Sequence, residues 1–251
     1  MLRLPETLCL ANLEEHMIHI PGGTFMRGGM GLGSNDEPRH EVSLDDFSLC
    51  RFPVSQKLWK EVMGGIEPPA WFQHPGRPVE RVSWSMVTEA FLPALREKTG
   101  NQGYSLPTEA QWEYAARGGP GGGLAGQAHD YYYAGSDRLK EVGWFSENSF
   151  EETQASGLKR PNTLGLYDLL GNVLSWCQDR YDPDYYQQLK DEYGDQAAHH
   201  PSGPEEGRIR VVRGGSWSNP SEVSGATYRN FNLLPPAVNN LGFRLCRNVS
   251  I

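Results

Sequence analysis

The feature that most constrains the fold of this chain is a segment near its C-terminus, residues 210–247. Two short motifs, RGGSW at residues 213–217 and LGFR at residues 241–244, bracket a stretch that has no helical period, no alternation and few charges. Glycine beside a large aromatic residue is typical of tight turns held by an anchor. We therefore expect two rigid ends with an irregular segment between them, framed by the rest of the chain.

Composition favours one turn-rich domain over a helix bundle. The 251 residues include 29 glycines, 18 prolines and 7 tryptophans, which predicts many irregular segments pinned by aromatic side chains. The length suits one large domain or two small ones. We expect a lead-in segment at residues 1–16 and a single domain at residues 17–251.

Charge and hydropathy narrow the range of partners and locations. A formal net charge of −8 without a Lys/Arg cluster argues against nucleic acid. There is no run of about 18 apolar residues, so we expect no membrane span. Pro5 and three acids interrupt the N-terminal residues, which excludes a signal peptide within the chain. The protein is then cytoplasmic or exported by a segment outside this sequence.

The four cysteines are far apart and form no C-x-x-C pair, so we expect reduced, mostly buried thiols rather than zinc ligands or a disulfide scaffold.

Local patterns predict short elements along the chain. Residues 17–28 look like a hairpin, residues 85–98 like a helix that Pro93 kinks or stops, and Thr108 begins a helix with Gln111 completing a capping box. In the proline-rich loop at residues 66–78, Trp71 and Phe72 are expected to fill the core.

Two acids on the helix that begins at Thr108 allow two interpretations. Glu109 and Glu113 have the i, i+4 spacing of a catalytic carboxylate pair. We favour the structural interpretation, in which they complement the helix dipole or pair with arginines.

Four motifs in order resemble the formylglycine-generating enzyme domain, also called the sulfatase-modifying factor family, from about residue 17 to 247. They are PGGTFM at residues 21–26, LPTEAQWEY at 106–114, GLYDLLGNV at 165–173, and RGGSW with GFR at 213–217 and 242–244. The resemblance implies an α+β fold of C-type-lectin-like architecture, with two helices on a small antiparallel sheet and extensive irregular loops.

The enzymatic branches of this family depart from the chain at their metal ligands. In the oxidase branch two cysteines follow the G-G-S-[WY] motif and hold copper, and by position they fall on Asn219 and Ser224. Because copper(I) needs soft thiolate ligands, sulfatase activation is disfavoured. The sulfoxide-forming iron branch adds an N-terminal bundle that carries the metal ligands, and sixteen lead-in residues cannot form one.

The resemblance also implies calcium near the G-N-V segment. Asp168 and the Gly171 carbonyl stand at ligand positions, but Ser175 occupies the carboxylate position. With fewer oxygen ligands, any calcium would be held weakly, and we expect no other cofactor.

A third branch comprises the variable proteins of diversity-generating retroelements, which diversify the segment between G-G-S-W and G-F-R. Copying errors at template adenines turn Asn codons into a set that excludes Lys, Glu, Gln, Met and Trp. Residues 223–240 contain none of these five types, and asparagines persist at Asn219, Asn230, Asn232, Asn239 and Asn240. This pattern resembles an Asn-rich template partly rewritten.

We therefore expect a non-catalytic, receptor-like protein whose residues 218–238 form a diversified recognition surface for a protein or other macromolecular ligand. Aromatic and apolar side chains suit such a surface, whereas Leu241 and Phe243 are expected in the core. The expected ligand-binding residues are Ser218, Val223, Ser224, Gly225, Thr227, Tyr228, Phe231, Leu233, Leu234, Ala237 and Val238.

Two alternatives stay open. The first is an enzyme of the formylglycine-generating-enzyme and sulfoxide-synthase superfamily, an oxidoreductase with divergent chemistry. Its candidate cleft residues are Tyr228, Arg229, Asp168 and Glu113. The second is a degenerate paralogue that serves as a partner or regulatory subunit.

Overall fold

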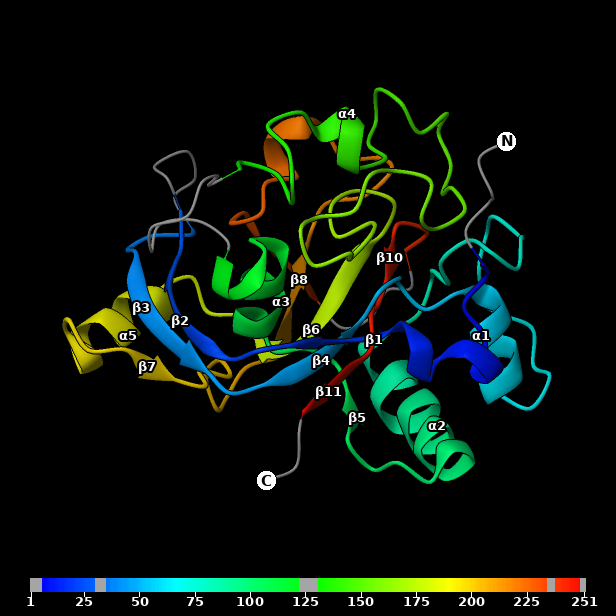
Figure 1. Cartoon of the computed structure of the whole chain (residues 1–251), viewed down its shortest axis with the longest axis horizontal. Helices are drawn as coiled ribbons and strands as arrows, with labels where there is room; N and C mark the ends of the chain where they lie inside the picture. The colour runs from blue at the N-terminus through cyan, green and yellow to red at the C-terminus, as the bar shows by residue number, and fades with distance from the viewer. Residues whose placement is uncertain (1–5, 30–34, 122–130, 234–237, 249–251) are drawn as a thin grey trace.

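The computed structural model describes residues 6–29, 35–121, 131–233 and 238–248. Short strands form three sheets around a central helix, α3 (Glu109–Ala116), with long irregular connections between them (Figure 1). This mixed α+β arrangement confirms the fold class expected from the sequence. It departs in detail, because the strands divide among three small sheets, two of which contain a parallel pair.

The first sheet has the strand order β1-β4-β11-β5 and joins the two ends of the chain. Its antiparallel strands are β1 (Met17–Ile20), β4 (Phe47–Cys50), β5 (Tyr104–Ser105) and β11 (Cys246–Asn248). The second sheet, of order β2-β3-β7, contains β2 (Gly23–Arg27), β3 (His40–Leu44) and β7 (Ala198–His199). The hairpin expected at residues 17–28 is wrong, because β1 pairs with β4 and β2 pairs with β3 in a different sheet.

The third sheet positions the C-terminal segment and has the order β10-β6-β8-β9. Its strands are β6 (Leu174–Arg180), β8 (Ile209–Arg213), β9 (Arg229–Leu233) and β10 (Leu241–Gly242). β8 and β9 pair antiparallel over their whole length, with Arg213 opposite Arg229 and Ile209 opposite Leu233. The strand β9 is therefore the edge of this sheet, and it lies within the segment that the sequence singled out.

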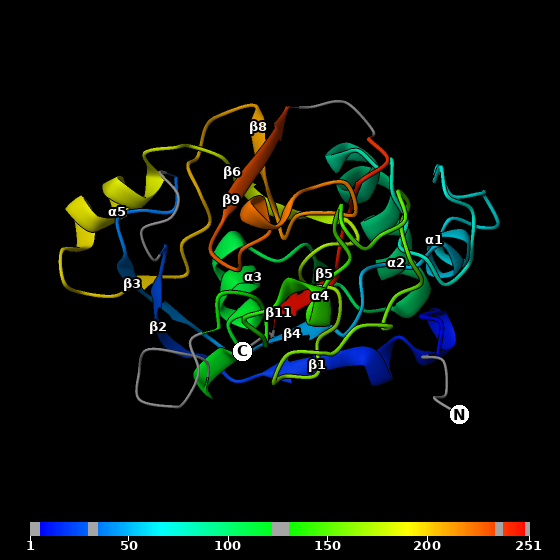
Figure 2. The ribbon, with the colours of Figure 1, turned by 90° about the horizontal axis from the view of Figure 1, so that it is seen from above.

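The helices cover the sheets from several sides (Figure 2). They are α1 (Gln56–Val62), α2 (Leu92–Thr99), α3, α4 (Leu139–Val142) and α5 (Tyr185–Tyr193). The expected helix at residues 85–98 begins as a π-helix, Met86–Phe91, which continues into α2 with Pro93 in its first turn. Pro93 has no N–H to donate to the preceding turn, and the π-helical turn lies where that hydrogen bond is missing.

The helix α3 starts as the sequence predicts. Thr108 accepts a hydrogen bond from the Gln111 N–H at 3.1 Å, and the Gln111 side chain accepts one from the Thr108 N–H at 2.9 Å. All eight residues of α3 are buried, and Trp112 lies fully inside the core. Since α3 has no solvent-facing side, its two glutamates must find buried partners.

Two apolar clusters form the core. One surrounds α3 and includes Trp112, and the other packs α1 and α2 against Phe243 and Leu241. Both Leu241 and Phe243 are fully buried, as expected. In the lead-in segment, Leu8 and Leu13 are buried against the second cluster. The division of the chain at residue 16 stays a prediction.

Candidate functional site

The C-terminal segment leaves the third sheet through a turn that only glycine permits. Gly214 has φ 98°, and a Cβ there would lie 2.3 Å from the Leu169 carbonyl oxygen. Gly215 has φ 69°, and its Cβ would lie 2.2 Å from Ser224 Oγ. Both the left-handed backbone and the close approach exclude a side chain. The turn therefore fixes where residues 216–228 leave the frame.

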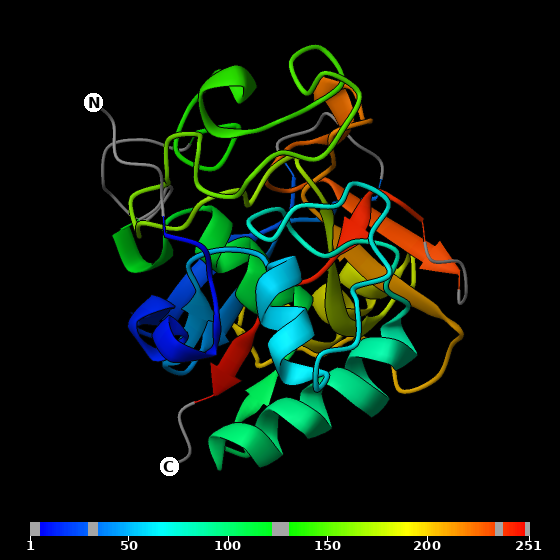
Figure 3. The ribbon, with the colours of Figure 1, turned by 90° about the vertical axis from the view of Figure 1, so that its right-hand side faces the viewer.

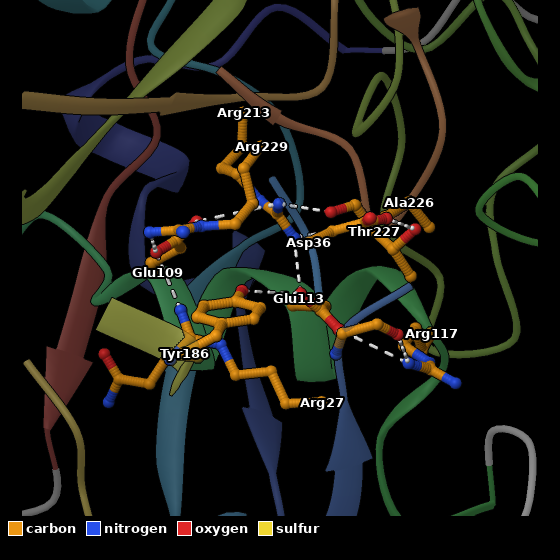
Figure 4. Close-up of polar contacts among 12 residues, drawn as sticks. Arg27, Asp36, Glu109, Glu113, Arg117, Tyr186, Arg213, Ala226, Thr227 and Arg229 are labelled. Carbon is orange, nitrogen blue, oxygen red and sulfur yellow. Dashed lines mark hydrogen bonds and ion pairs between the residues drawn. The ribbon is translucent and has the colours of Figure 1, made fainter. Parts of the chain in front are cut away.

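The two carboxylates of α3 pair with arginines from β2, β8 and β9 (Figure 4). Glu109 accepts from Arg229 Nε at 2.9 Å and lies 2.8 Å from Arg27 Nη2. Glu113 accepts from Arg213 Nη2 at 2.6 Å and from Arg117 at 3.3 Å. These contacts confirm the structural interpretation of the two glutamates.

Opposing electrostatic effects set the protonation state of this buried cluster. Burial alone raises the pKa of Glu109, but the charges of Arg229, Arg27 and Arg213 overcome it and lower that pKa to about 2. Arg229 and Arg213 respond in the opposite direction: burial lowers their pKa values, and the carboxylates raise them by more. The cluster is therefore charged and internally paired at neutral pH.

The same cluster holds the backbone of the C-terminal segment. Arg213 donates to the Thr227 carbonyl at 2.7 Å and to the Ala226 carbonyl at 3.0 Å. Asn35 donates its side-chain amide to the Arg229 carbonyl at 2.6 Å. Residues 226–229 are therefore tied to side chains from distant parts of the chain.

The expected ligand-binding residues separate into surface and interior positions. Ser218 is exposed, and Val223, Thr227, Tyr228 and Val238 are half-buried. Phe231 is 46% exposed and stacks on the Tyr181 ring, with centroids 4.5 Å apart. Leu233 lies in β9 and only its backbone is described, whereas Leu234 and Ala237 lie outside the described residues.

Two expected ligand-binding positions are wrong in this structure because they are buried. Ser224 is fully inaccessible, and its hydroxyl donates to the Pro220 carbonyl at 3.1 Å. Gly225 is buried against the Tyr132 hydroxyl, which would lie 3.2 Å from an added Cβ. Local sequence gave no sign of this burial, since the contacts come from the Gly215 turn and from a loop about ninety residues upstream.

A cleft that the sequence did not reveal opens beside both ends of the segment. It has a volume of about 560 Å³ and is lined by Trp71, Phe72, Ser146, Ser149, Glu151, Trp217, Ser218 and Asn239. Figure 3 shows the loop at residues 66–78 (cyan) close to β10 (red) on this side of the molecule. Trp71 was expected in the core and is instead 66% exposed, while Phe72 packs edge-on against Trp217 with centroids 5.4 Å apart.

The two residues that stand where the oxidase branch has its copper-binding cysteines form local hydrogen bonds. Asn219 accepts from Ser216 Oγ at 2.6 Å, and Ser224 closes the short 3-10 turn Ser221–Val223. Of the four candidate cleft residues for the alternative in which the protein is an enzyme, Glu113 and Arg229 belong to the buried ion-pair cluster. Asp168 is also buried and Tyr228 half-buried, so these four side chains do not line one open cleft.

The calcium positions near Gly171 offer few ligands. Asp168 is buried, one of its oxygens accepts from the Gly157 N–H at 2.7 Å, and the other has no partner. Burial raises the pKa of Asp168 to about 6 despite nearby Arg244. Ser175 is buried in β6. One carboxyl beside a guanidinium does not fit an ion that takes six to eight oxygens.

Among the described residues, no group of three or more His, Cys, Asp or Glu side chains could hold a metal ion. The expectation of no tightly bound cofactor stays a prediction.

The fold and its rigid frame define a domain of the formylglycine-generating-enzyme type. The model of the sulfatase-modifying factor enzyme 1-like domain matches residues 4–249, so the chain belongs to this family. A formylglycine-generating enzyme of Streptomyces coelicolor is 34% identical over 69% of this chain and 53% of its own length. Serine/threonine-protein kinase pkn1 of Chlamydia pneumoniae is 34% identical over 93% of this chain, which spans only 38% of that kinase.

A solved structure connects the chain to the variable-protein branch. Treponema denticola variable protein 1 superposes with a TM-score of 0.76 at 28% identity, covering 92% of this chain and 94% of that one. This likeness supports the resemblance to variable proteins of diversity-generating retroelements. None of the helices in the described part of the chain is long and apolar enough to cross a membrane.

Proposed function

We propose that the chain is a non-catalytic ligand-binding protein and that residues 218–238 form a diversified recognition surface. The observation that carries the proposal is a difference between residues of this segment: one is held in the core and others reach the surface. Arg229 is buried and paired with Glu109, whereas its neighbours Tyr228 and Phe231 reach the surface. A surface can vary without loss of the fold only if its backbone is held by residues that stay constant.

The constant contacts come from outside the segment. Arg213, Glu109 and Asn35 bind its backbone or its buried arginine. The glycine turn at Gly214 and Gly215 sets its direction. Substitutions at the surface positions therefore leave the main supports in place.

The surface has the composition of a protein-recognition site. Tyrosine, serine, asparagine and tryptophan provide rigid aromatic contacts together with adaptable hydrogen bonds. Tyr228 and Phe231 lie on the segment itself, and the cleft beside it adds Trp71, Trp217 and Asn239. A protein or other macromolecule is the partner that these features suit.

The neighbourhood of the gene provides a test. The proposal expects a near-copy of the segment that encodes residues 213–244, with AAC or AAT at the codons that differ, beside a reverse transcriptase gene. A complete genome that contains neither the copy nor the reverse transcriptase would count against diversification of this chain by its own element.

A further inference from the structure

Three adjacent strands of the third sheet align a row of polar side chains, Arg180, Arg210 and Asn232. Arg180 of β6 lies directly opposite Arg210 of β8, and Arg210 lies directly opposite Asn232 of β9. Directly opposed residues of antiparallel strands point to the same face of a sheet. The row therefore spans the sheet on one face, and its last member belongs to the C-terminal segment.

The two guanidinium groups are positioned by the frame. Arg210 lies over the Trp84 ring, 3.7 Å from its centroid, and donates to the Gln178 carbonyl at 2.7 Å. Arg180 donates to the Gly207 carbonyl at 3.1 Å. The Nε of Arg210 is buried and has no hydrogen-bond partner. Stacking on tryptophan orients the guanidinium plane, so the terminal nitrogens rather than the buried Nε are the ones left to meet another group.

Within the described part of the chain, the two arginines of this row have no carboxylate in direct contact. No carboxylate there forms an ion pair with Arg180 or Arg210, although Glu205 and Glu206 lie in the loop before β8. Burial lowers the pKa of Arg210 and the charge of Arg180 lowers it further, while Asp179 raises it by less than these two effects together. Two like charges held side by side are costly unless an anion joins them, and they stand out on a chain of net charge −8.

We propose that the row of Arg180, Arg210 and Asn232 binds carboxylate side chains of an acidic segment on a protein partner. The arginines provide the constant, charged part of the contact, because a guanidinium fork matches a carboxylate. Asn232, on the diversified strand, adjusts the fit. In naming a protein as partner the inference rests on the proposed recognition function. A long polyanion is a poor fit because two arginines cannot offset repulsion from the remaining acidic surface.

The probe for this row is an acetylated hexaglutamate peptide, titrated into the full chain at low ionic strength by calorimetry. Arg180→Gln and Arg210→Gln should each weaken its binding about tenfold, the loss of one charge-assisted hydrogen bond. Lys140→Gln removes the same charge from an exposed site on α4 and should change binding by less than about twofold.

A second variant separates binding from folding. Arg210→Gln removes a side chain that packs on Trp84, so it can lower stability. Asn232→Asp leaves that packing intact and places a negative charge in the row, and it should abolish peptide binding. Near-ultraviolet circular dichroism checks that each variant keeps its tertiary structure.

Failure of the peptide to bind would overturn the inference, and so would either of two other results. Equal weakening in all the variants, Lys140→Gln included, would mean that binding depends only on overall charge. Sulfate bound as tightly as the peptide would mean that the row accepts small anions rather than an acidic segment. Failure of the peptide to bind leaves the genomic test untouched. Equally, if the gene were not diversified, peptide binding that depends on Arg180 and Arg210 would still support the inference about the row.

Discussion

Arg229 contacts both carboxylate oxygens of Glu109, through Nε at 2.9 Å and Nη2 at 3.2 Å, across 120 residues of sequence. The two residues join the edge strand β9 to the central helix α3. This contact fixes the C-terminal segment to the core through Arg229. We therefore expect Arg229 to stay constant, whereas the surface residues on either side of it can vary.

Breaking this pair should destabilise the whole domain. Arg229→Met leaves Glu109 with fewer cationic partners in a fully buried site, which should cost about 3–5 kcal/mol of unfolding free energy. Arg138→Met is the control, because the Arg138 side chain is 72% exposed and should cost less than about 1 kcal/mol. Urea denaturation of the three proteins measures the difference, and similar midpoints for the two variants would contradict the assigned role of Arg229.

The same chemical change should destabilise the protein to very different extents at two phenylalanines. Phe231→Ala removes a side chain that is 46% exposed, and we expect a loss of about 1 kcal/mol. Phe243→Ala empties a fully buried site beside Trp59 and Phe91, and we expect about 3–5 kcal/mol. Thermal unfolding of both variants tests this contrast. A larger loss at Phe231 would place that residue in the scaffold rather than in the recognition surface.

The glycine turn should tolerate no side chain. Gly214→Ala brings a Cβ to 2.3 Å from the Leu169 carbonyl oxygen and should cost well over 2 kcal/mol, since both backbone strain and a clash oppose it. Gly165→Ala is the matched control: its φ is 77°, and nothing lies within 4 Å of the added Cβ. That change should cost about 1 kcal/mol. If denaturation showed that the two variants lose similar amounts of stability, the left-handed backbone alone, without the clash, would explain why position 214 needs glycine.

Asp179 should make stability fall as the pH rises. Burial raises its pKa to about 7, with Glu109 adding to the effect, against about 3.9 in the unfolded chain. A raised carboxyl pKa contributes stability below the unfolded value and loses it as pH rises through the folded value. Between about pH 4 and 7, Asp179 therefore opposes folding increasingly.

Asp179→Asn should remove this dependence. The amide oxygen can still accept from the Glu109 N–H, now bonded at 2.8 Å, and carries no charge. We expect the variant to gain up to about 4 kcal/mol over the parent at pH 8 and little at pH 4. Unfolding free energies measured from pH 4 to 8 provide the test. Parallel pH curves for the two proteins would refute the assignment to Asp179.

The sequence was informative wherever a local pattern or a family motif determined the structure. The capping box of Thr108 and Gln111, the burial of Leu241 and Phe243, and the α+β class were all predicted correctly. The pairing of Glu109 with arginines was predicted as a type of contact. That Arg27 and Arg229 supply it could not be foreseen, because strands far apart in the chain bring them together.

The wrong predictions for Ser224 and Trp71 share one physical origin, which is that contacts between distant parts of the chain decide which side chains are buried. Ser224 was expected at the surface because it lies in the segment between the two motifs, but the Gly215 turn packs against it. Trp71 looked like a core residue because tryptophan is large and apolar, but its loop lies at the mouth of a cleft. In irregular segments no periodicity distinguishes the inner from the outer side chains, so tertiary contacts decide.

The most direct measurement for the central claim is the sequence of this gene in many isolates of one strain lineage. The account predicts substitutions between codons 218 and 238, concentrated at exposed or half-buried positions such as Val223, Tyr228, Phe231 and Val238. The codons for Arg229, Gly214 and Glu109 should be unchanged. A segment as uniform as the rest of the gene across the lineage would contradict the account.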